Sequence, residues 1–470
     1  MTRRISKFWL GLCAIVLVGV GIRFVSLELW SPSKVPETVL LNCTSYKVYI
    51  CGDAVYYHEA ANLLADGKGF MDPYRYLYGG NEAVTLDNGT ATVIVTPVGH
   101  EEPTAGHPPM YVLYLGAFSA LGLQSLVAHQ IASIVLGSAS VLLAGLVGRS
   151  LRNGRTGLIA AFLTAVYANI WLNDTALMSE TAAVFFVFVS TFFGLRFVRE
   201  SSRSNAALFG IAGALAALSR AELLLFLPIV AAVALWKTPI AWRERFLRYA
   251  IAGVVCCAVL APWVIRNNLV MEEPITLSDG TGTVLVQANC DDTYYGRHIG
   301  YWSFPCGGTQ PYGPNGELLD ESQRDVVVRQ RATEYISNHT TRLLTVVIPA
   351  RIGRMWGLYE PLEQVRLDIN EGRPSFPSKL GFLQYLLLAP SALAGAVIQW
   401  RRRQPLLVIG LWAVLATVTA AIAFGNTRYR IAAEVSIVLL ASIAFEALWS
   451  WSERKRSSNR QPDPETVNAA

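Results

Sequence analysis

The sequence predicts an all-α protein that crosses a membrane many times. Of its 470 residues, 53% are hydrophobic and only 16% are charged. The apolar residues gather in blocks of about 16 to 24, the length that a helix needs to cross the hydrocarbon layer of a bilayer. Short basic segments separate these blocks. Composition, block length and basic connections together indicate a polytopic membrane protein with about ten transmembrane helices.

The first apolar block, residues 8–27, is expected to be a retained span. It follows Arg3, Arg4 and Lys7 and lacks a small-residue cleavage site, so no signal peptide is expected. Nine further spans are predicted at about 126–149, 157–173, 177–198, 205–219, 222–236, 246–265, 380–400, 405–424 and 431–451. The apolar run 108–122 is short for a span. Counting it as one would move the later basic loops to the opposite side of the membrane, so we interpret it as juxtamembrane or re-entrant.

Basic residues fall in alternate connections between these spans, as the positive-inside rule requires for cytoplasmic loops. The protein is therefore expected to be a multi-pass protein of the plasma (inner) membrane with both termini in the cytoplasm. The net charge of +5 reflects this orientation, so nucleic acid is not an expected partner. Two long polar segments, 28–107 and 266–379, then lie outside the cytoplasm.

Four segments follow from this topology. Residues 1–265 form a membrane module whose first external loop is 28–125, and residues 266–379 form a second external loop that we call the cap. Residues 380–452 supply the C-terminal transmembrane helices, and 453–470 are expected to be a disordered cytoplasmic tail. The cap is too long for a linker, and residues 317–339 within it are predicted to be helical.

The two external loops carry two cysteines each, Cys43 and Cys51 in the first and Cys290 and Cys306 in the cap. An oxidising compartment favours disulfides, and local pairing within each loop is the natural arrangement. Sequence alone does not fix which cysteines pair.

Asp53 begins a predicted helix that ends at Gly67 beside the first span. One interpretation is structural, because Asp is a favoured N-cap residue. The other is that Asp53 acts as a general base for a hydroxyl that attacks a sugar carbon. Tyr57 shares the helix face of Asp53, whereas His58 lies on another face. His107 precedes a Pro-Pro pair, and these three ring residues are candidates for a substrate pocket.

Two further acids, Asp174 and Glu180, lie in the next external connection. Glu180 falls about one turn inside a span, where an ionised group is costly. A hydrogen-bonded network with the first loop would offset that cost, and the alternative is a solvated carboxylate at a helix end. Zinc-type ligand spacing is absent, so no structural metal is predicted. A divalent cation beside Asp53 and Glu180 stays open as an alternative.

Several arginines lie at the outer ends of spans, where the positive-inside rule does not place them. The planar guanidinium suits a phosphate at headgroup depth, which makes these residues candidate donor-phosphate ligands. The alternatives are snorkelling to lipid headgroups, or pairing with Glu222 and Glu434. The candidates are Arg220, Arg266, Arg428 and Arg430, with Arg354 added from a segment that also suits a lipid-anchoring helix.

These features resemble the GT-C superfamily of integral membrane glycosyltransferases, in particular the bacterial branch related to protein O-mannosyltransferases and aminoarabinose-lipid A transferases. The resemblance runs nearly end to end, and the order and spacing of short segments carry it. The segments are Gly52-Asp53 with Tyr57, Ala60 and Gly67-Lys-Gly-Phe70, then His107-Pro-Pro-Met-Tyr111, Met178-Ser-Glu180, Leu218-Ser-Arg220, Pro262-Trp-Val-Ile-Arg266-Asn267 and Thr427-Arg-Tyr-Arg430.

The resemblance implies that Asp53 matches the catalytic aspartate of the first loop and that Glu180 or Asp174 matches a second acidic position. It also implies an inverting reaction with a polyprenyl-phosphate sugar donor, whose phosphate meets the external arginines. Asp53 is followed by Ala54, where the mannosyltransferases have a second acid. The acceptor, which would be a glycan, a lipid or a protein, is therefore left open.

The sequence thus predicts a glycosyltransferase that acts on the extracytoplasmic side of the membrane. Two other classes are considered. A transporter or flippase for a lipid-linked saccharide would also need arginines near the lipid, but the chain shows no clear inverted repeat and its polar mass lies on one side. The other class is a catalytically inactive membrane protein that binds sugar.

Overall fold

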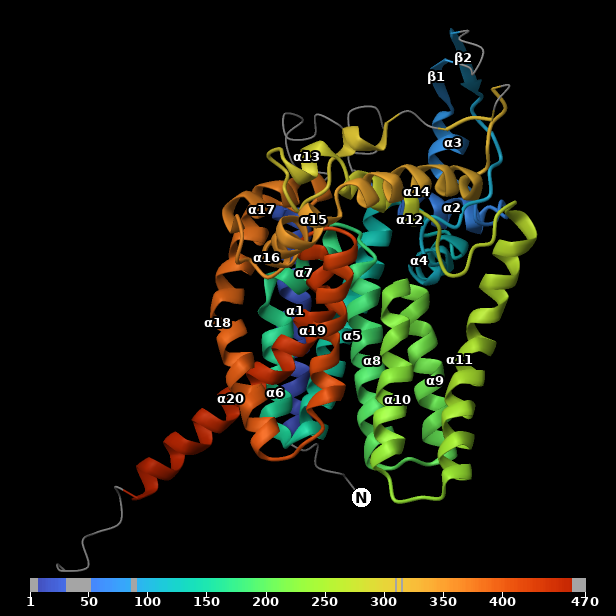
Figure 1. Cartoon of the computed structure of the whole chain (residues 1–470). Coiled ribbons are helices and arrows are strands. Elements are labelled where there is room, and N and C mark those ends of the chain that lie inside the picture. The colour runs from blue at the N-terminus through green and yellow to red at the C-terminus, as the bar shows by residue number, and fades with distance from the viewer. Residues whose placement is uncertain (1–6, 31–51, 86–90, 309–310, 314–315, 459–470) are drawn as a thin grey trace, which may run out of the picture.

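The computed structural model describes residues 7–30, 52–85, 91–308, 311–313 and 316–458 (Figure 1). Most of the described chain is helical, in a bundle of long helices with a layer of shorter elements across one end. The bundle helices are α1 (Lys7–Trp30), α5 (Leu126–Leu151), α6 (Gly154–Val166), α7 (Ala168–Thr175), α8 (Glu180–Arg199), α9 (Arg203–Ser219), α10 (Phe226–Lys237), α11 (Trp242–Val270), α18 (Ser375–Arg401), α19 (Leu406–Ile422) and α20 (Ile431–Ser458).

Every predicted span is helical, but the helices differ in length. Among the described residues, six helices are long and apolar enough to cross a membrane, and a seventh span results if the bent pair α6 and α7 counts as one. The six are α1, α5, α8, α11, α18 and the continuous segment Thr427–Ser457. Helices α9, α10 and α19 have 17, 12 and 17 residues. The count of about ten spans therefore stays a prediction.

The predicted span 157–173 is divided at Tyr167, where α6 and α7 meet at an angle of 51°. A break inside a membrane frees backbone groups that need new partners. The freed groups here are the Ala168 N–H and the Val166 carbonyl. The side chain of Gln384 in α18 pairs with both, because it accepts from the N–H at 2.8 Å and donates to the carbonyl at 2.9 Å. The break is thus compensated by a side chain far away in the sequence.

Small residues allow the central helices to approach closely, as is common within membranes. A Cβ atom on Gly157 of α6 would lie 2.5 Å from the Gly145 carbonyl oxygen of α5. A Cβ on Gly395 of α18 would lie 1.9 Å from the Leu440 carbonyl oxygen of α20. In the apolar 18-residue window of segment 427–457, 78% of the residues are accordingly buried, against 22% in the corresponding windows of α1 and α11, which present apolar side chains outward, as lipid-facing helices do.

The first loop, between α1 and α5, forms several short elements at one end of the bundle (Figure 1). They are α2 (Asp53–Ala65), α3 (Pro73–Tyr78), β1 (Gly80–Thr85), β2 (Ala91–Thr96) and α4 (Met110–Ala120). The antiparallel pair β1 and β2 runs in register from Gly80 opposite Thr96 to Thr85 opposite Ala91. The predicted all-α class is confirmed, and this hairpin, which was not predicted, is a small addition to it; its β-branched run 92–96 has strand propensity. Helix α4 occupies the apolar run 108–122 and packs against α2.

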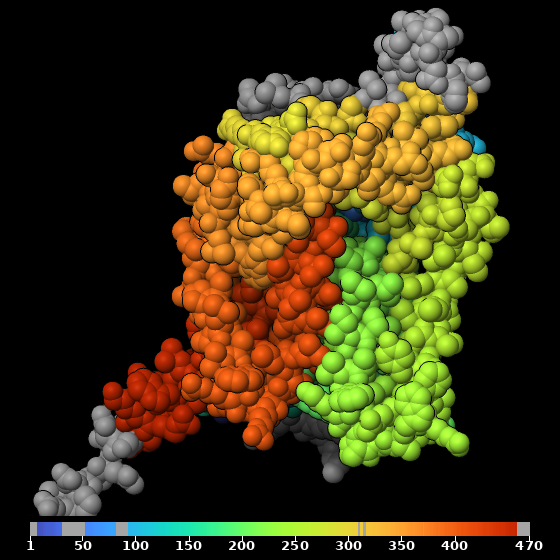
Figure 2. All heavy atoms as spheres, viewed as in Figure 1, coloured from blue at the N-terminus to red at the C-terminus, as the bar shows by residue number. Residues whose placement is uncertain are grey.

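The cap lies across the same end of the bundle (Figure 2). The helices on either side of it, α11 and α18, narrow the predicted range 266–379 to 271–374. Its helices are α12 (Thr281–Ala288), α13 (Asp291–Tyr294), α14 (Glu321–Asn338), α15 (Thr340–Arg342), α16 (Ile348–Met355) and α17 (Pro361–Leu367), with short helical turns η4 (Phe304–Gly307), η5 (Leu343–Val347) and η6 (Asp368–Glu371). Helix α14 matches the prediction of 317–339 and begins with a capping box at Asp320. The turns η3 (Ala221–Leu225) and η7 (Thr427–Arg430) lead into α10 and α20.

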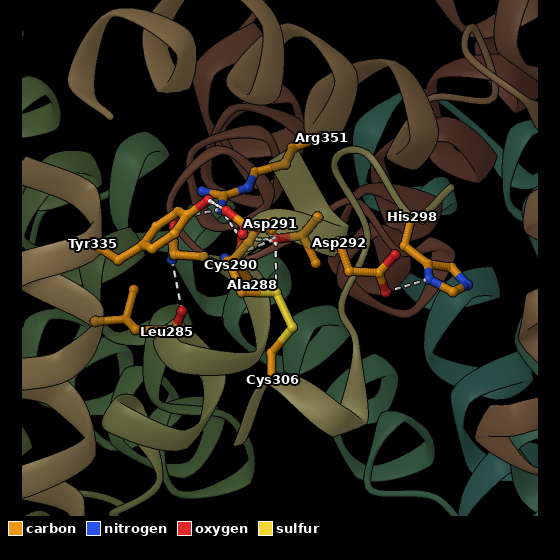
Figure 3. Close-up of a disulfide and its surroundings, with 11 residues drawn as sticks. Leu285, Ala288, Cys290, Asp291, Asp292, His298, Cys306, Tyr335 and Arg351 are labelled. Atoms are coloured by element: carbon orange, nitrogen blue, oxygen red, sulfur yellow. Dashed lines mark hydrogen bonds and ion pairs between the residues drawn. A yellow bond between two sulfur atoms is a disulfide. The ribbon is translucent and has the colours of Figure 1, made fainter. Parts of the chain in front are cut away.

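The predicted disulfide between Cys290 and Cys306 is confirmed (Figure 3). Nearby, Arg351 of α16 donates to the Ala288 carbonyl and to the Asn289 side chain, at 2.7 and 2.9 Å, and so fastens α16 to α12. The other predicted pair, Cys43 with Cys51, lies outside the described residues. Helix α20 extends to Ser458, so the predicted disordered tail does not begin at 453, and residues 459–470 lie outside the described part.

Replacing Cys290 and Cys306 with serine is expected to destabilise the cap by about 2–4 kcal/mol, because the link closes a loop of 16 residues and restricts the unfolded chain. Limited proteolysis should then cut within 271–374 faster than in the wild type. The matched control is Cys257→Ser, a free cysteine on α11. Equal cleavage rates in all three proteins would contradict this role of the disulfide.

Candidate active site

Asp53 is the first residue of α2, and its side chain is not used to cap the helix. The N-cap is Gly52, whose φ of +52° suits glycine, and no side-chain hydrogen bond caps this helix. The capping interpretation of Asp53 is therefore wrong. The carboxylate is available for other contacts, and its side chain is 31% exposed.

The Arg428 guanidinium binds three carboxylates that come from distant parts of the chain. Its Nη2 donates to Asp53 at 2.6 Å, its Nε donates to Glu180 at 2.7 Å, and its Nη1 donates to Glu371. Arg428 lies in η7, which the Asn426 side chain caps by accepting from the Arg428 N–H at 3.0 Å. One guanidinium thus joins the first loop, the start of α8 and the end of the cap.

Glu180 begins α8 and is fully buried, as its predicted position inside a span requires. A buried carboxylate is costly unless it is paired. Two arginines offset that cost, because Arg220 also donates to Glu180, at 2.9 Å. Arg220 further pairs with Glu222 at 2.6 Å. The predicted network between Glu180 and the first loop is therefore present.

Glu371 of η6 is the site residue that the sequence did not indicate. It accepts from Arg428, from the Asn426 side chain at 2.9 Å and from the Trp302 indole at 2.7 Å. Trp302 belongs to the cap, so Glu371 links the cap to the arginine. The surrounding loop has no apolar periodicity, and its several acids gave no reason to choose this one.

His107 faces the exposed side of Asp53, with 3.9 Å between its Nε2 and the Asp53 Oδ1. Its ring packs against Tyr56 and Tyr57, with centroids 4.6 and 5.0 Å apart. Burial lowers the pKa of His107, and the charge of Asp53 opposes this shift only in part. His107 is thus a neutral imidazole near pH 7, suited to hydrogen bonding beside the carboxylate.

Burial on its own would raise the pKa of Asp53. The positive charge of Arg428, the hydrogen bond from Arg428 and the charge of Arg220, joined in acid by protonated His107, together outweigh burial, so the pKa is lowered. In this arrangement Asp53 is ionised but weakly basic. Loss of the Arg428 contact would make it a stronger base.

Five of the predicted site residues lie outside this cluster. His58 is buried and hydrogen-bonds His129, with 2.9 Å between the Nδ1 atoms. Arg266 donates to the Phe70 and Thr104 carbonyls, each at 2.7 Å, and so fastens the first loop. Arg430 pairs with Glu434 at 2.7 Å, which is the alternative considered from the sequence.

Arg354 is fully buried in α16, where its Nε donates to the Ile299 carbonyl at 2.7 Å. It therefore does not lie along the membrane surface as an anchor. Asp174 is buried beside α1, where it pairs with Arg23 at 2.6 Å and accepts from Thr181 at 2.7 Å. Gly137 makes room for this pair, because a Cβ there would lie 2.1 Å from an Asp174 oxygen.

Asp174→Asn is expected to destabilise the protein by about 3–5 kcal/mol, because it leaves the Arg23 charge buried without a carboxylate. The double variant Arg23→Met with Asp174→Asn should recover most of that loss and retain glycosyl transfer. Thermal unfolding in detergent measures the first effect and a transfer assay the second. An inactive but stable double variant would show that the pair of Arg23 and Asp174 serves the reaction.

The alternative of a divalent cation beside Asp53 and Glu180 does not fit the geometry. In the part of the chain that the structure describes, no three His, Cys, Asp or Glu side chains converge as metal ligands. The Arg428 guanidinium lies between the two carboxylates and contacts both. As placed, these side chains form a site for a guanidinium.

Known proteins that are similar to this chain include a mannosyltransferase family and solved oligosaccharyltransferases. Residues 106–265 match the family described as dolichyl-phosphate-mannose-protein mannosyltransferase. This segment contains His107, Glu180 and Arg220, whereas Asp53 and Arg428 lie outside it. No curated protein matches the chain in sequence.

Among solved structures, the archaeal oligosaccharyltransferase AglB from Archaeoglobus fulgidus, in complex with an inhibitory peptide and a dolichol-phosphate, matches with a TM-score of 0.51 and 13% identity. The match covers 97% of this chain and 52% of AglB. A second structure of the Archaeoglobus fulgidus oligosaccharyltransferase, in complex with Zn and sulfate, has a TM-score of 0.49 and 13% identity over 94% of this chain and 49% of that one. The chain thus spans about half the length of the solved enzyme. The family match over 106–265 and the fold over nearly the whole chain confirm the predicted resemblance to the GT-C superfamily of membrane glycosyltransferases.

Proposed function

We propose that this chain is an inverting glycosyltransferase that moves a sugar from a polyprenyl-phosphate donor to an acceptor in the cell envelope. The observation that carries the proposal is the cluster in which Arg428 joins Asp53 to Glu180, with Arg220 beside it. A carboxylate and two arginines at the boundary between a bundle of apolar helices and a polar layer suit a lipid phosphate on one side and a hydroxyl on the other.

In the proposed reaction, Asp53 takes the proton of an acceptor hydroxyl while that oxygen attacks the anomeric carbon of the donor sugar. The bond from this carbon to the phosphate oxygen breaks, and the polyprenyl phosphate leaves with the electron pair. Arg220 and Arg428 stabilise the negative charge on the departing phosphate. Attack opposite the leaving group inverts the anomeric centre.

Donor binding would also activate the base. Arg428 holds the pKa of Asp53 down in the structure. A donor phosphate that draws the guanidinium away from Asp53 would release this effect and make the carboxylate more basic. The ionised base would then be available only when the donor is in place. Glu180, which is buried and binds both arginines, would keep them oriented.

The arrangement of the fold supports an extracytoplasmic site. Helix α2 lies at the end of the bundle covered by the cap, opposite the end at which α1 begins (Figure 1). The chain's basic connections, such as Arg199 to Arg203, belong to the opposite end and would be cytoplasmic. Polyprenyl-phosphate sugars would supply the donor outside the cytoplasm, and the acceptor would be a glycan, a lipid or a protein.

A donor panel tests this proposal. Purified protein is mixed with a series of polyprenyl-phosphate sugars and a mixed envelope extract as acceptor, and the released polyprenyl phosphate is measured. We expect release with one donor and little with the others. The absence of turnover with every donor would favour a transporter or an inactive sugar-binding protein.

A further inference from the structure

A polar cavity of about 270 Å³ lies between the cap and the first loop, separate from the cluster at Arg428. Its walls come from α12, α14, η4 and the residue that precedes α3. Four carboxylates line it: Asp72, Asp279, Glu321 and Asp325. The guanidinium in the wall, Arg324, is already engaged, because it donates to Glu102 at 2.5 Å and to the Leu319 carbonyl at 2.6 Å.

All four carboxylates accept from a backbone N–H, and the partners of the first three are as follows. Asp72 accepts from the Tyr74 N–H at 2.8 Å, Glu321 from the Ala105 N–H at 2.8 Å, and Asp325 from the Gly282 N–H at 2.5 Å. These bonds hold the side chains in place around the cavity.

Asp279 is different, because only one of its two oxygens is used. Its Oδ1 accepts from the Gly280 N–H at 2.7 Å. Its Oδ2 has no hydrogen-bond donor among the described residues, although the residue is only 8% exposed. The neighbouring Asp325 side chain can hydrogen-bond Asp279 only when one of the two carboxyls is protonated. A buried oxygen without a partner is costly, so the cavity presents an acceptor that a ligand would satisfy.

The charge balance of the cavity favours a cation. Burial, together with the charge of Asp325, raises the pKa of Asp279 to about 7. Burial and the charge of Asp279 raise the pKa of Glu321 to about 8. These shifts mean that the negative charge is poorly compensated, and a bound cation would compensate it.

The shape of the cavity selects among cations. The four carboxylates surround an open space, and nowhere in the described chain do three such side chains converge as metal ligands. A protonated amine with its carbon skeleton is larger than a bare metal ion, so it fits an open space better. Its three N–H donors, without any acceptor, match the carboxylate oxygens in the wall. Thr283 and Gln287 in the same wall can contact the polar groups beside the amine.

We propose that this cavity binds a protonated amine carried by the acceptor, with Asp279 as the main hydrogen-bond partner. The assignment of the amine to the acceptor rests on the proposed function. Glu321 accepts from Ala105, only two residues before His107, and His107 faces Asp53. Two residues span at most about 7 Å, so the part of the first loop that contacts the cavity wall and the part that faces Asp53 are close along the chain.

Binding to the full chain, without donor, tests the inference independently of glycosyl transfer. The probes are two amines, Nα-acetyl-lysine amide and glucosamine, each with a neutral partner, Nα-acetyl-norleucine amide and glucose. Isothermal titration of the purified protein should show saturable binding of at least one amine, and binding about 10-fold weaker or more for its neutral partner. Binding of the lysine probe alone identifies a peptide source for the amine, and binding of glucosamine alone identifies an amino sugar.

Asp279→Asn should weaken amine binding by about 10- to 100-fold. Glu321→Gln, which can still accept from Ala105, serves as a second variant, and thermal unfolding checks that both are folded. Glu334→Gln is the matched control, because it removes an acid from the exposed side of α14. Equal binding of the neutral partners, binding unchanged by both cavity variants, binding of Ca²⁺ in place of the amines, or no amine binding at millimolar concentration would each overturn the inference. Failure of the donor panel with intact amine binding would instead count against the proposed function.

Discussion

Asp53→Asn is expected to lower kcat of glycosyl transfer by about 10²- to 10⁴-fold, the usual contribution of a general base. The asparagine amide has nearly the same shape, and its oxygen can still accept from Arg428, but it cannot take up a proton. Helix α2 should be unaffected, because Gly52 and not Asp53 provides the N-cap. The change should therefore fall on kcat, while donor binding and the unfolding temperature stay near their wild-type values.

The measurement is release of polyprenyl phosphate under saturating donor, together with donor binding to the same preparation. Asp66→Asn is the matched control, because it makes the same chemical change at the other end of α2, where Asp66 contacts the Gln124 side chain at 3.1 Å. The control should transfer sugar at the wild-type rate. Transfer by Asp53→Asn at that rate would contradict the assignment of Asp53 as the base.

The helices were well predicted because the signals that specify them are local. Length and hydropathy of each apolar block suffice to predict a membrane helix, and every predicted block is helical. The break at Tyr167 was not predicted, because the side chain that compensates it, Gln384, is 217 positions further along the sequence. The hairpin of β1 and β2 was missed although the run 92–96 is rich in β-branched residues.

Part of the candidate site was predicted, namely the charged residues that the predicted topology places at the outer ends of spans. Residues at the outer ends of spans share one depth in the membrane, so Glu180, Arg220 and Arg428 were expected near Asp53 in height. The way the helices pack side by side decides which of these charged side chains contact one another, and no local sequence pattern specifies that packing. Arg430 is two residues from Arg428, yet it turns toward Glu434 inside the bundle. Glu371 contacts Arg428 from a loop without any regular pattern.

Arg428→Gln is expected to abolish transfer and to destabilise the protein by about 3–5 kcal/mol, because it leaves the buried Glu180 with only Arg220 as a charged partner. A second substitution separates the two effects. In the double variant Arg428→Gln with Glu180→Gln, the fully buried carboxylate is removed and Glu371 keeps its donors Asn426 and Trp302, so thermal unfolding in detergent should return toward the wild-type temperature. Transfer should remain absent, since the donor phosphate has still lost its main guanidinium.

The neighbouring pair Arg430 and Glu434 provides the control for this experiment, because it is also a buried arginine–glutamate pair but does not contact Asp53. Arg430→Gln should also destabilise the protein, and adding Glu434→Gln should restore both stability and transfer. If the Arg430 double variant is stable but inactive, Arg430 is also needed by the donor. If the Arg428 double variant is stable and active, the cluster at Arg428 holds the helices together without serving the reaction, and the proposed mechanism is wrong.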